Sequence, residues 1–344
     1  MKQIPLSIAG SNAYLTVGAG NFDITVTGTG TGEGLFVAMG PGNDTAQVDH
    51  VKDGGVTLGP GNSTVTLTGV STNDLVILQS VKGNTDVVDA GQMAQGAIVA
   101  GNGNTVIHDA GAGAYISVGD GNNDISASGN SDVIVAGSGR NTIQARGDND
   151  LINVAALGGK SDVIVANGRI DTIVSAGGDS TIVAGGAYDH ISINAGYSNV
   201  VALGWADTIS VGGDDDGTPA KADVFVDDGS SVYVSGHTLY TTISEAGILN
   251  RVFLTDNGSA AIGMGLAGNT VIVDGTAGDY GGQADINDLG TNVVDLHQIT
   301  GLGTFTEVKA ALVHAGGNWK LPIPGGGDIV FIGEKPTAAN FSFT

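Results

Sequence analysis

The chain has 344 residues, a formal net charge of −23, 59 glycines and no cysteine. Apolar residues make up 41% and charged residues only 14%, which excludes a disordered chain, since disorder requires low hydrophobicity. The 12 basic residues are scattered singly, so nucleic acid and anionic membranes are poor partners. Glycine without a three-residue register excludes collagen. Strand formers mixed with Gly, Asn and Asp predict an all-β chain.

Targeting features are few. The amino-terminal stretch has one basic residue and no apolar run of signal-peptide length, so we expect no cleavable leader. No apolar run reaches the length of a membrane helix, and we expect no membrane insertion. The absence of cysteine fits a chain that is secreted unfolded, without the help of disulfides.

Repeats begin close to the amino terminus. Leu15 and Ile24 are nine residues apart, and a Gly-x-Gly-Asn turn starts at Gly18, Gly40 and Gly59 and again at positions 101 and 119. Glycine is needed where a tight turn requires positive φ. The early turns are spaced less evenly than the later ones, so we interpret the first hundred residues as a solenoid with looser coils.

The stretch from 119 to 211 is the most regular part. Nine-residue spacing of apolar anchors is the signature of a parallel β-solenoid in which two nonapeptides form one coil of about 18 residues. A step of twelve predicts a three-residue insertion within 156–160 that bulges from one turn. The expected anchors are Ile125, Ile134, Ile143, Ile152, Ile164, Ile173, Ile182, Ile191, Val201 and Ile209.

Residues 18 apart should stack on the same edge of such a solenoid, which sorts the turns into two columns. In the first column every turn reads Gly-x-x-Asp-x-apolar, and in the second the equivalent positions are mostly Asn. We identify as candidate Ca²⁺ ligands the five aspartates of the first column, one from the second and one from an early turn. These are Asp132, Asp150, Asp171, Asp189, Asp207, Asp162 and Asp44.

A stacked row of carboxylates favours a cation. Successive coils lie about 4.7–4.9 Å apart, where two carboxylates repel by about 1 kcal/mol in water and by several times more at the lower effective dielectric of a protein surface. The alternative is that aspartate is a good turn residue whose side chain caps its own backbone. Asparagine would cap without the repulsion, and it fills the other column.

The register changes after residue 211. We expect 1–211 to be regular solenoid and 212–290 to be an irregular continuation with longer loops, including an acidic loop at 214–217 that is either solvated or a further cation site. We expect 291–344 to be a carboxy-terminal cap, in which residues 304–315 have helical spacing. Two short strands follow, and the chain ends on Asn-Phe-Ser-Phe at 340–343.

Two sets of residues resemble a known family. Gly119, Gly121, Asn123 and Ile125 stand where the repeats-in-toxin calcium β-roll has its Gly-x-Gly-x-Asp-x-apolar pattern, and the residues 18 positions later do likewise. The segment 291–344 is similar to that family's carboxy-terminal cap. The resemblance implies Ca²⁺ bound between adjacent turns and an uncleaved signal for type I secretion. The aspartate column departs from this pattern because its glycine lies three residues before each aspartate.

The functional prediction is a structural protein. The chain has none of the zinc-protease, nucleophile-elbow or phosphate-loop motifs, and its six histidines lack ligand spacing, so we do not expect an enzyme. We predict a secreted, Ca²⁺-binding protein that self-assembles into a cell-surface layer, fibre or matrix, with itself and a cell-surface polysaccharide as partners. The alternatives are a calcium-dependent adhesin, an ice-binding rod, a phage tail-fibre-like rod, or a polysaccharide lyase or epimerase.

Overall fold

The fold is a parallel β-solenoid, as predicted. The computed structural model describes residues 2–8, 13–28, 34–49, 52–155, 160–212, 220–235, 241–255, 258–274 and 281–344. They form about 13 turns of about 19 residues, one more per turn than predicted, and helix accounts for 3% of the chain. The predicted insertion at 156–159 and the acidic loop at 214–217 lie outside the described residues. The chain divides into two compact units, residues 1–171 and 172–344.

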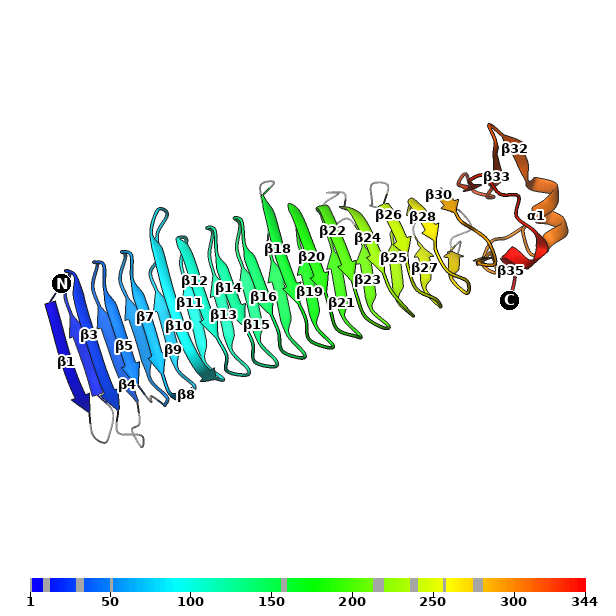
Figure 1. The fold of residues 1–344 in the computed structure, drawn as a ribbon. Helices are drawn as coiled ribbons and strands as arrows, with labels where there is room; N and C mark the ends of the chain where they lie inside the picture. Colours follow the sequence, from blue (N-terminus) through cyan, green and yellow to red (C-terminus); the bar gives the residue numbers. More distant parts are fainter. Residues whose placement is uncertain are drawn as a thin grey trace. The chain divides into compact units, whose positions relative to one another are not determined.

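Unit 1 consists of two parallel sheets that alternate along the chain (Figure 1). Sheet A contains β1 (Lys2–Ile8), β3 (Phe22–Gly28), β5 (Thr45–Asp49), β7 (Thr64–Thr68), β10 (Thr85–Ala94), β12 (Asn104–Asp109), β14 (Asp124–Ala127), β16 (Thr142–Ala145) and β18 (Ser161–Ala166). Sheet B contains β2 (Ala13–Val17), β4 (Leu35–Met39), β6 (Gly55–Leu58), β9 (Leu75–Leu78), β11 (Ala97–Ala100), β13 (Tyr115–Val118), β15 (Val133–Ala136) and β17 (Leu151–Val154). The short β8 (Val70–Thr72) pairs with the second half of β10.

Unit 2 repeats the arrangement. One sheet contains β20 (Asp179–Ala184), β22 (Gly196–Ala202), β24 (Ala220–Val226), β26 (Thr241–Glu245), β28 (Ala260–Met264) and β30 (Gln283–Asn287). The other contains β19 (Thr172–Ser175), β21 (His190–Ile193), β23 (Thr208–Val211), β25 (Ser231–Val234), β27 (Arg251–Leu254), β29 (Thr270–Val273) and β31 (Val293–Asp295). Paired strands therefore continue through the stretch expected to be irregular.

The core follows the nine-residue period because a strand turns alternate side chains inward. Nine of the ten predicted anchors have no exposed surface at all. The exception is Val201, which is an outward residue paired with Val183. Its neighbour Val200 is the buried anchor, in register with Ile182. The true spacing on both sides of this position is therefore nine, and the steps of ten and eight read from the sequence were wrong.

Glycines in the turns let successive coils stack closely. A Cβ at Gly147 would lie 1.6 Å from the carbonyl oxygen of Gly129, and one at Gly139 would lie 1.6 Å from that of Gly121. No side chain fits at that distance. At Gly18, in the first of these turns, the constraint is absent, because a Cβ there would meet nothing within 4 Å.

The carboxy-terminal segment closes unit 2. The predicted helix is present but shorter than expected: α1 (Phe305–Ala311) contains the buried Val308, and the last three residues of the stretch 304–315 form a strand instead. Three short strands follow: β32 (Val313–Ala315), β33 (Asn318–Pro322) and β34 (Asp328–Phe331). β33 pairs antiparallel with both β32 and β34. β34 extends the sheet of β30, and β35 (Phe341–Ser342) extends that of β31. None of the helices in the described part of the chain could span a membrane.

Candidate functional site

The aspartates of the first column occupy a repeated turn geometry. The residue before each of them adopts a left-handed backbone conformation, with φ of 64° at Ser131, 63° at Asn149 and 64° at Ile170. This conformation is unfavourable for most side chains and most of all for a β-branched one. It turns the chain so that the following aspartate points into the coil, whereas the preceding residue is left outside.

In unit 1 the aspartates stack as predicted, but they face inward. Asp132, Asp150 and Asp171 expose 0%, 1% and 0% of their surface. The Oδ1 atom of each accepts a hydrogen bond from the backbone N–H one coil earlier: Ala114 donates to Asp132, Asp132 to Asp150, and Asp150 to Asp171, each at 2.9 Å. We call this row the aspartate ladder. It satisfies a turn N–H that would otherwise be buried without a partner.

The second carboxylate oxygen of Asp132 and Asp150 is in a different environment from the first. The Oδ2 atoms of Asp132 and Asp150 are buried and have no hydrogen-bond partner. The pKa of Asp132 is raised to about 6, chiefly by burial and in smaller part by the charges of Asp150 and Asp109, against the N–H of Ala114, which lowers it. Burial also raises the pKa of Asp150. A buried carboxylate with one unsatisfied oxygen favours a proton or a cation at that oxygen.

In unit 2 the ladder changes from acidic to neutral residues along the chain. The N–H of Asp189 donates to Oδ1 of Asp207 at 3.0 Å, and burial raises the pKa of Asp207 to about 6. The N–H of Asp207 then donates to the hydroxyl of Ser230 at 3.3 Å. In the later coils the same bond is accepted by amide oxygens, those of Asn250, Asn269 and Asn292.

Two of the three asparagines also form a hydrogen bond through Nδ2, the atom that stands where aspartate has Oδ2. The Nδ2 of Asn269 donates to the carbonyl of Leu266 at 3.0 Å, and that of Asn292 donates to the carbonyl of Met264 at 3.0 Å. Asn269 and Asn292 therefore satisfy both ends of the amide at this turn, whereas the Nδ2 of Asn250 has no hydrogen-bond partner. Asp132 and Asp150 each leave one oxygen unsatisfied at the equivalent position.

The two remaining candidates lie on the other edge of unit 1. Asp162 accepts hydrogen bonds from the N–H and Nδ2 of Asn141, at 2.7 and 3.0 Å, and Asp44 accepts one from the N–H of Phe22 at 3.0 Å. Both are buried, and burial raises the pKa of each. They are not part of the aspartate ladder, since Asp162 stacks on Asn141 and Asn123.

The chemistry of the ladder suits a hard cation, since carboxylate and carbonyl oxygens are the ligands that Ca²⁺ prefers. Asp132 and Asp150, in successive coils of the ladder, each offer one carboxylate oxygen that has no hydrogen-bond partner. Within the described ranges, no group of three or more acidic or histidine side chains is arranged to hold a metal ion. A cation at the ladder would therefore depend on turn carbonyls for most of its ligands.

Four further buried acidic residues were missed from the sequence. Asp74 and Asp86 bind backbone N–H groups of the preceding coil, those of Gly54 and Ser63, in the same way as the ladder. Asp74 lies directly before β9 and Asp86 is the second residue of β10; the uneven early spacing concealed this signal. Asp109 bonds within its own turn, to Gly111. Glu245 lies at the end of β26, two residues after the buried Ile243, and the alternation of the strand was the signal for its burial.

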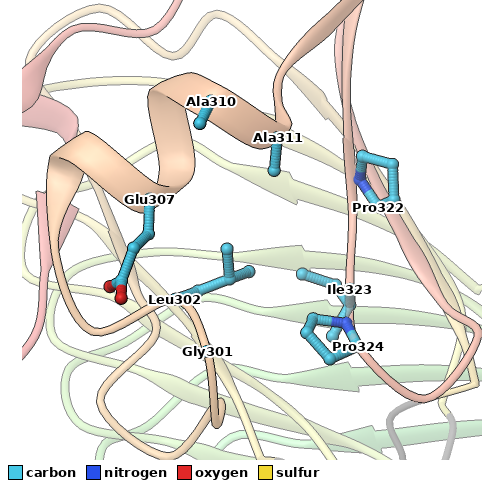
Figure 2. Close-up of a pocket in the computed structure, with 8 residues that line it drawn as sticks. All are labelled: Gly301, Leu302, Glu307, Ala310, Ala311, Pro322, Ile323 and Pro324. Carbon is cyan, nitrogen blue, oxygen red and sulfur yellow. The ribbon is translucent and has the colours of Figure 1, made fainter.

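One pocket opens in the cap between α1 and β33 (Figure 2). Its walls are mostly apolar, with Leu302, Ile323 and Pro324 toward its base and the carboxylate of Glu307 at one side. That carboxylate accepts a hydrogen bond from Thr304, whose hydroxyl caps the start of α1. The Glu307 carboxylate is therefore engaged with the N-cap residue of the helix, and the pocket brings no second polar side chain toward it.

Comparison with protein-family models, with curated proteins and with solved structures finds no match to the chain.

Proposed function

We propose that this protein is an extracellular structural protein that self-assembles into a surface layer, fibre or matrix, and that Ca²⁺ orders its coils. The observation that carries the proposal is the aspartate ladder of unit 1. It repeats a buried carboxylate in successive coils, and in Asp132 and Asp150 one oxygen has no hydrogen-bond partner. A protein without need of a cation could use asparagine there, as the later coils do.

Electrostatics explain why a cation would stabilise the coils. Carboxylates one strand spacing apart repel each other, and burial increases both that repulsion and the loss of hydration. A cation beside the unused oxygens would offset both terms. In a compartment poor in Ca²⁺ the coils would then be less stable, which suits a chain that is exported unfolded, and they would become ordered outside the cell.

Thermal unfolding at pH 7.5 tests the role of the cation. We expect millimolar Ca²⁺ to raise the melting temperature, because a ligand present at 100 times its Kd stabilises the folded state by about 2.7 kcal/mol. Mg²⁺ at the same concentration controls for ionic strength. The double variant Asp132→Asn/Asp150→Asn should lose most of the increase, whereas Asp124→Asn, on an outward position of sheet A, should retain it. A melting temperature indifferent to chelator would show the metal part to be wrong.

Light scattering tests self-assembly separately. Neutralisation of the acidic chain by Ca²⁺ should make scattering rise cooperatively with Ca²⁺ concentration and fall again when chelator is added. A protein that stays monomeric at millimolar Ca²⁺ and high concentration would contradict assembly, whatever its melting temperature does.

An adhesin is the second candidate, supported by an aromatic pair in unit 2. Tyr233 and Phe253 are outward neighbours on β25 and β27, with ring centroids 4.4 Å apart and an interplanar angle of 4°. Tyr233 is 37% exposed. Flat aromatic surfaces of this kind stack on sugar rings. Retardation in a gel that contains an acidic polysaccharide, abolished by Tyr233→Ser, would favour this function.

The proposal that the protein is secreted rests on the carboxy-terminal segment, 291–344. That segment has a structural role as well, because Asn340 donates to the carbonyls of Gly290 and Asn292 and the Phe341 ring packs against Phe331. Deletion would therefore unfold the cap. The single variant Phe343→Ser is the milder test, since Phe343 is half-buried and its ring stacks on Phe341. We expect it to impair export through a type I exporter while lowering the melting temperature less than deletion does.

A further inference from the structure

One outer face of unit 1 carries no charged side chain. The outward positions of sheet B, from β2 to β17, form two columns of eight residues each, aligned by the strand register. We call these sixteen positions the uncharged face. The first column is Tyr14, Phe36, Gly55, Leu75, Ala97, Tyr115, Val133 and Leu151, and the second is Thr16, Ala38, Thr57, Ile77, Val99, Ser117, Val135 and Asn153.

The apolar side chains of this face are exposed. Tyr14 is 75% exposed, Tyr115 44% and Leu151 40%. Tyr14 stacks on Phe36 with ring centroids 5.1 Å apart and an interplanar angle of 9°. Phe36 in turn lies beside Gly55, where a Cβ would come within 3.4 Å of the ring. The aromatic rings therefore lie along the column and help to form a continuous apolar strip.

The other outward surfaces differ. In unit 1 the outward positions of sheet A include Asp23, Asp89 and Asp124 as well as His108. In unit 2 the corresponding face of the β19–β31 sheet carries His190, Arg251 and Asp295. For a chain with a net charge of −23, sixteen consecutive outward positions without a charge are unexpected on a solvated surface. Contiguous exposed apolar patches on proteins mark interaction sites.

We propose that the uncharged face binds the same face of a second copy of this chain. This deepens the proposed function, on which it rests, by naming the contact through which copies associate. Two copies repel through their acidic surfaces, and this face is where close approach buries no charge. Identical faces related by a twofold axis are self-complementary, and two sheets packed face to face are a stable arrangement with side chains interdigitating about 10 Å apart.

The size of the face agrees with this partner. Eight strands at about 4.8 Å and four residues at about 3.3 Å give a patch of roughly 500 Å² per copy, or roughly 1,000 Å² in total. That is at the lower limit for a specific protein interface. The contact should therefore be reversible, with a dissociation constant in the micromolar range, and it should strengthen when salt or Ca²⁺ screens the repulsion of the remaining surface.

Sedimentation velocity with matched variants tests the proposal. Val99→Glu/Val133→Glu places two charges on the uncharged face, and Val106→Glu/Val163→Glu makes the same change at outward positions of sheet A in the same unit. At millimolar Ca²⁺ we expect the first pair to weaken self-association at least tenfold and the second to change it less than threefold. Circular dichroism establishes that both variants are folded.

A cross-link gives an independent measurement, because the chain has no cysteine of its own. Val99 lies near the centre of the face, so Val99→Cys should form a disulfide-linked dimer under mild oxidation, whereas Val106→Cys should not. If the wild-type protein associates and the face variant does so equally, this interface is wrong and the proposed function stands. A wild-type protein that remains monomeric would overturn both. Retardation by polysaccharide that only the face variant loses, with no dimer, would assign the face to a glycan instead.

Discussion

The ladder aspartates show which properties of a single residue can be predicted from the sequence. An aspartate directly before a strand, with a step of 18 residues that the insertion lengthens to 21, was sufficient to predict that Asp132, Asp150 and Asp171 stack. The inward orientation of the aspartate could not be predicted, because it depends on the left-handed backbone conformation of the residue before it. Ser131 and Ile170 adopt that conformation without being glycine, so the sequence gives no sign of it. The stack therefore lies in the core, where hydration is lost, and not on the surface.

Glu245 is the residue whose substitution should change stability most clearly. It is 4% exposed, neither carboxylate oxygen has a partner, and burial raises its pKa to about 8. Its register neighbours are Val226 and Met264. A buried polar group without partners costs about 1–3 kcal/mol, so Glu245→Met should raise the free energy of unfolding by about that amount, measured by urea titration.

The pH dependence of stability distinguishes the effect of the charge of Glu245 from the effect of its polarity. Because the folded-state pKa is raised, the folded protein holds a proton that the unfolded chain releases between about pH 4.5 and 8, and stability falls as pH rises through that range. Glu245→Gln should remove this fall while leaving a buried polar group, and Glu245→Met should remove both. Parallel pH profiles for wild type and Glu245→Gln would contradict the assignment.

At the scale of the structural element, which here is one coil, the turn glycines determine how closely successive coils stack. Gly147 faces the carbonyl oxygen of Gly129 at a distance that excludes any Cβ. Gly147→Ala should therefore force two coils apart and lower the melting temperature by several degrees, as expected for a loss of about 2 kcal/mol or more in a single domain. Gly18→Ala is the control, since a Cβ there meets nothing within 4 Å, and its melting temperature should stay within about one degree of wild type.

The whole fold was predictable from one number, the nine-residue period, because each nonapeptide supplies one strand and one turn and parallel stacking does the rest. The cap was predictable from helical spacing around Val308. The uncharged face was not, since outward positions belong to no period: Tyr14, Leu75 and Leu151 acquire a common surface only once the register of sheet B is known. Surface function in a solenoid therefore follows from register, which the sequence shows less clearly than the core.

At the scale of the molecule, the buried aspartates should make stability depend on pH and, under the proposed function, on Ca²⁺ as well. Burial raises the pKa of Asp74, Asp109, Asp132 and Asp207 to about 6 each. The folded protein therefore binds more protons than the unfolded chain between about pH 4 and 6. The contribution of these four aspartates to stability should rise as pH falls through that window, and above about pH 7 it should be lost entirely.

Protons and Ca²⁺ would compete for the same oxygens, so the two effects should not add. We expect the melting temperature without Ca²⁺ to be higher at pH 5 than at pH 7.5, and the increase caused by Ca²⁺ to be several degrees at pH 7.5 but nearly absent at pH 4.5. Asp132→Asn should reduce both the acid stabilisation and the Ca²⁺ effect, because the amide neither titrates nor attracts the ion. Calorimetry across that range measures all three quantities, and a Ca²⁺ effect of equal size at both pH values would place the ion away from the ladder.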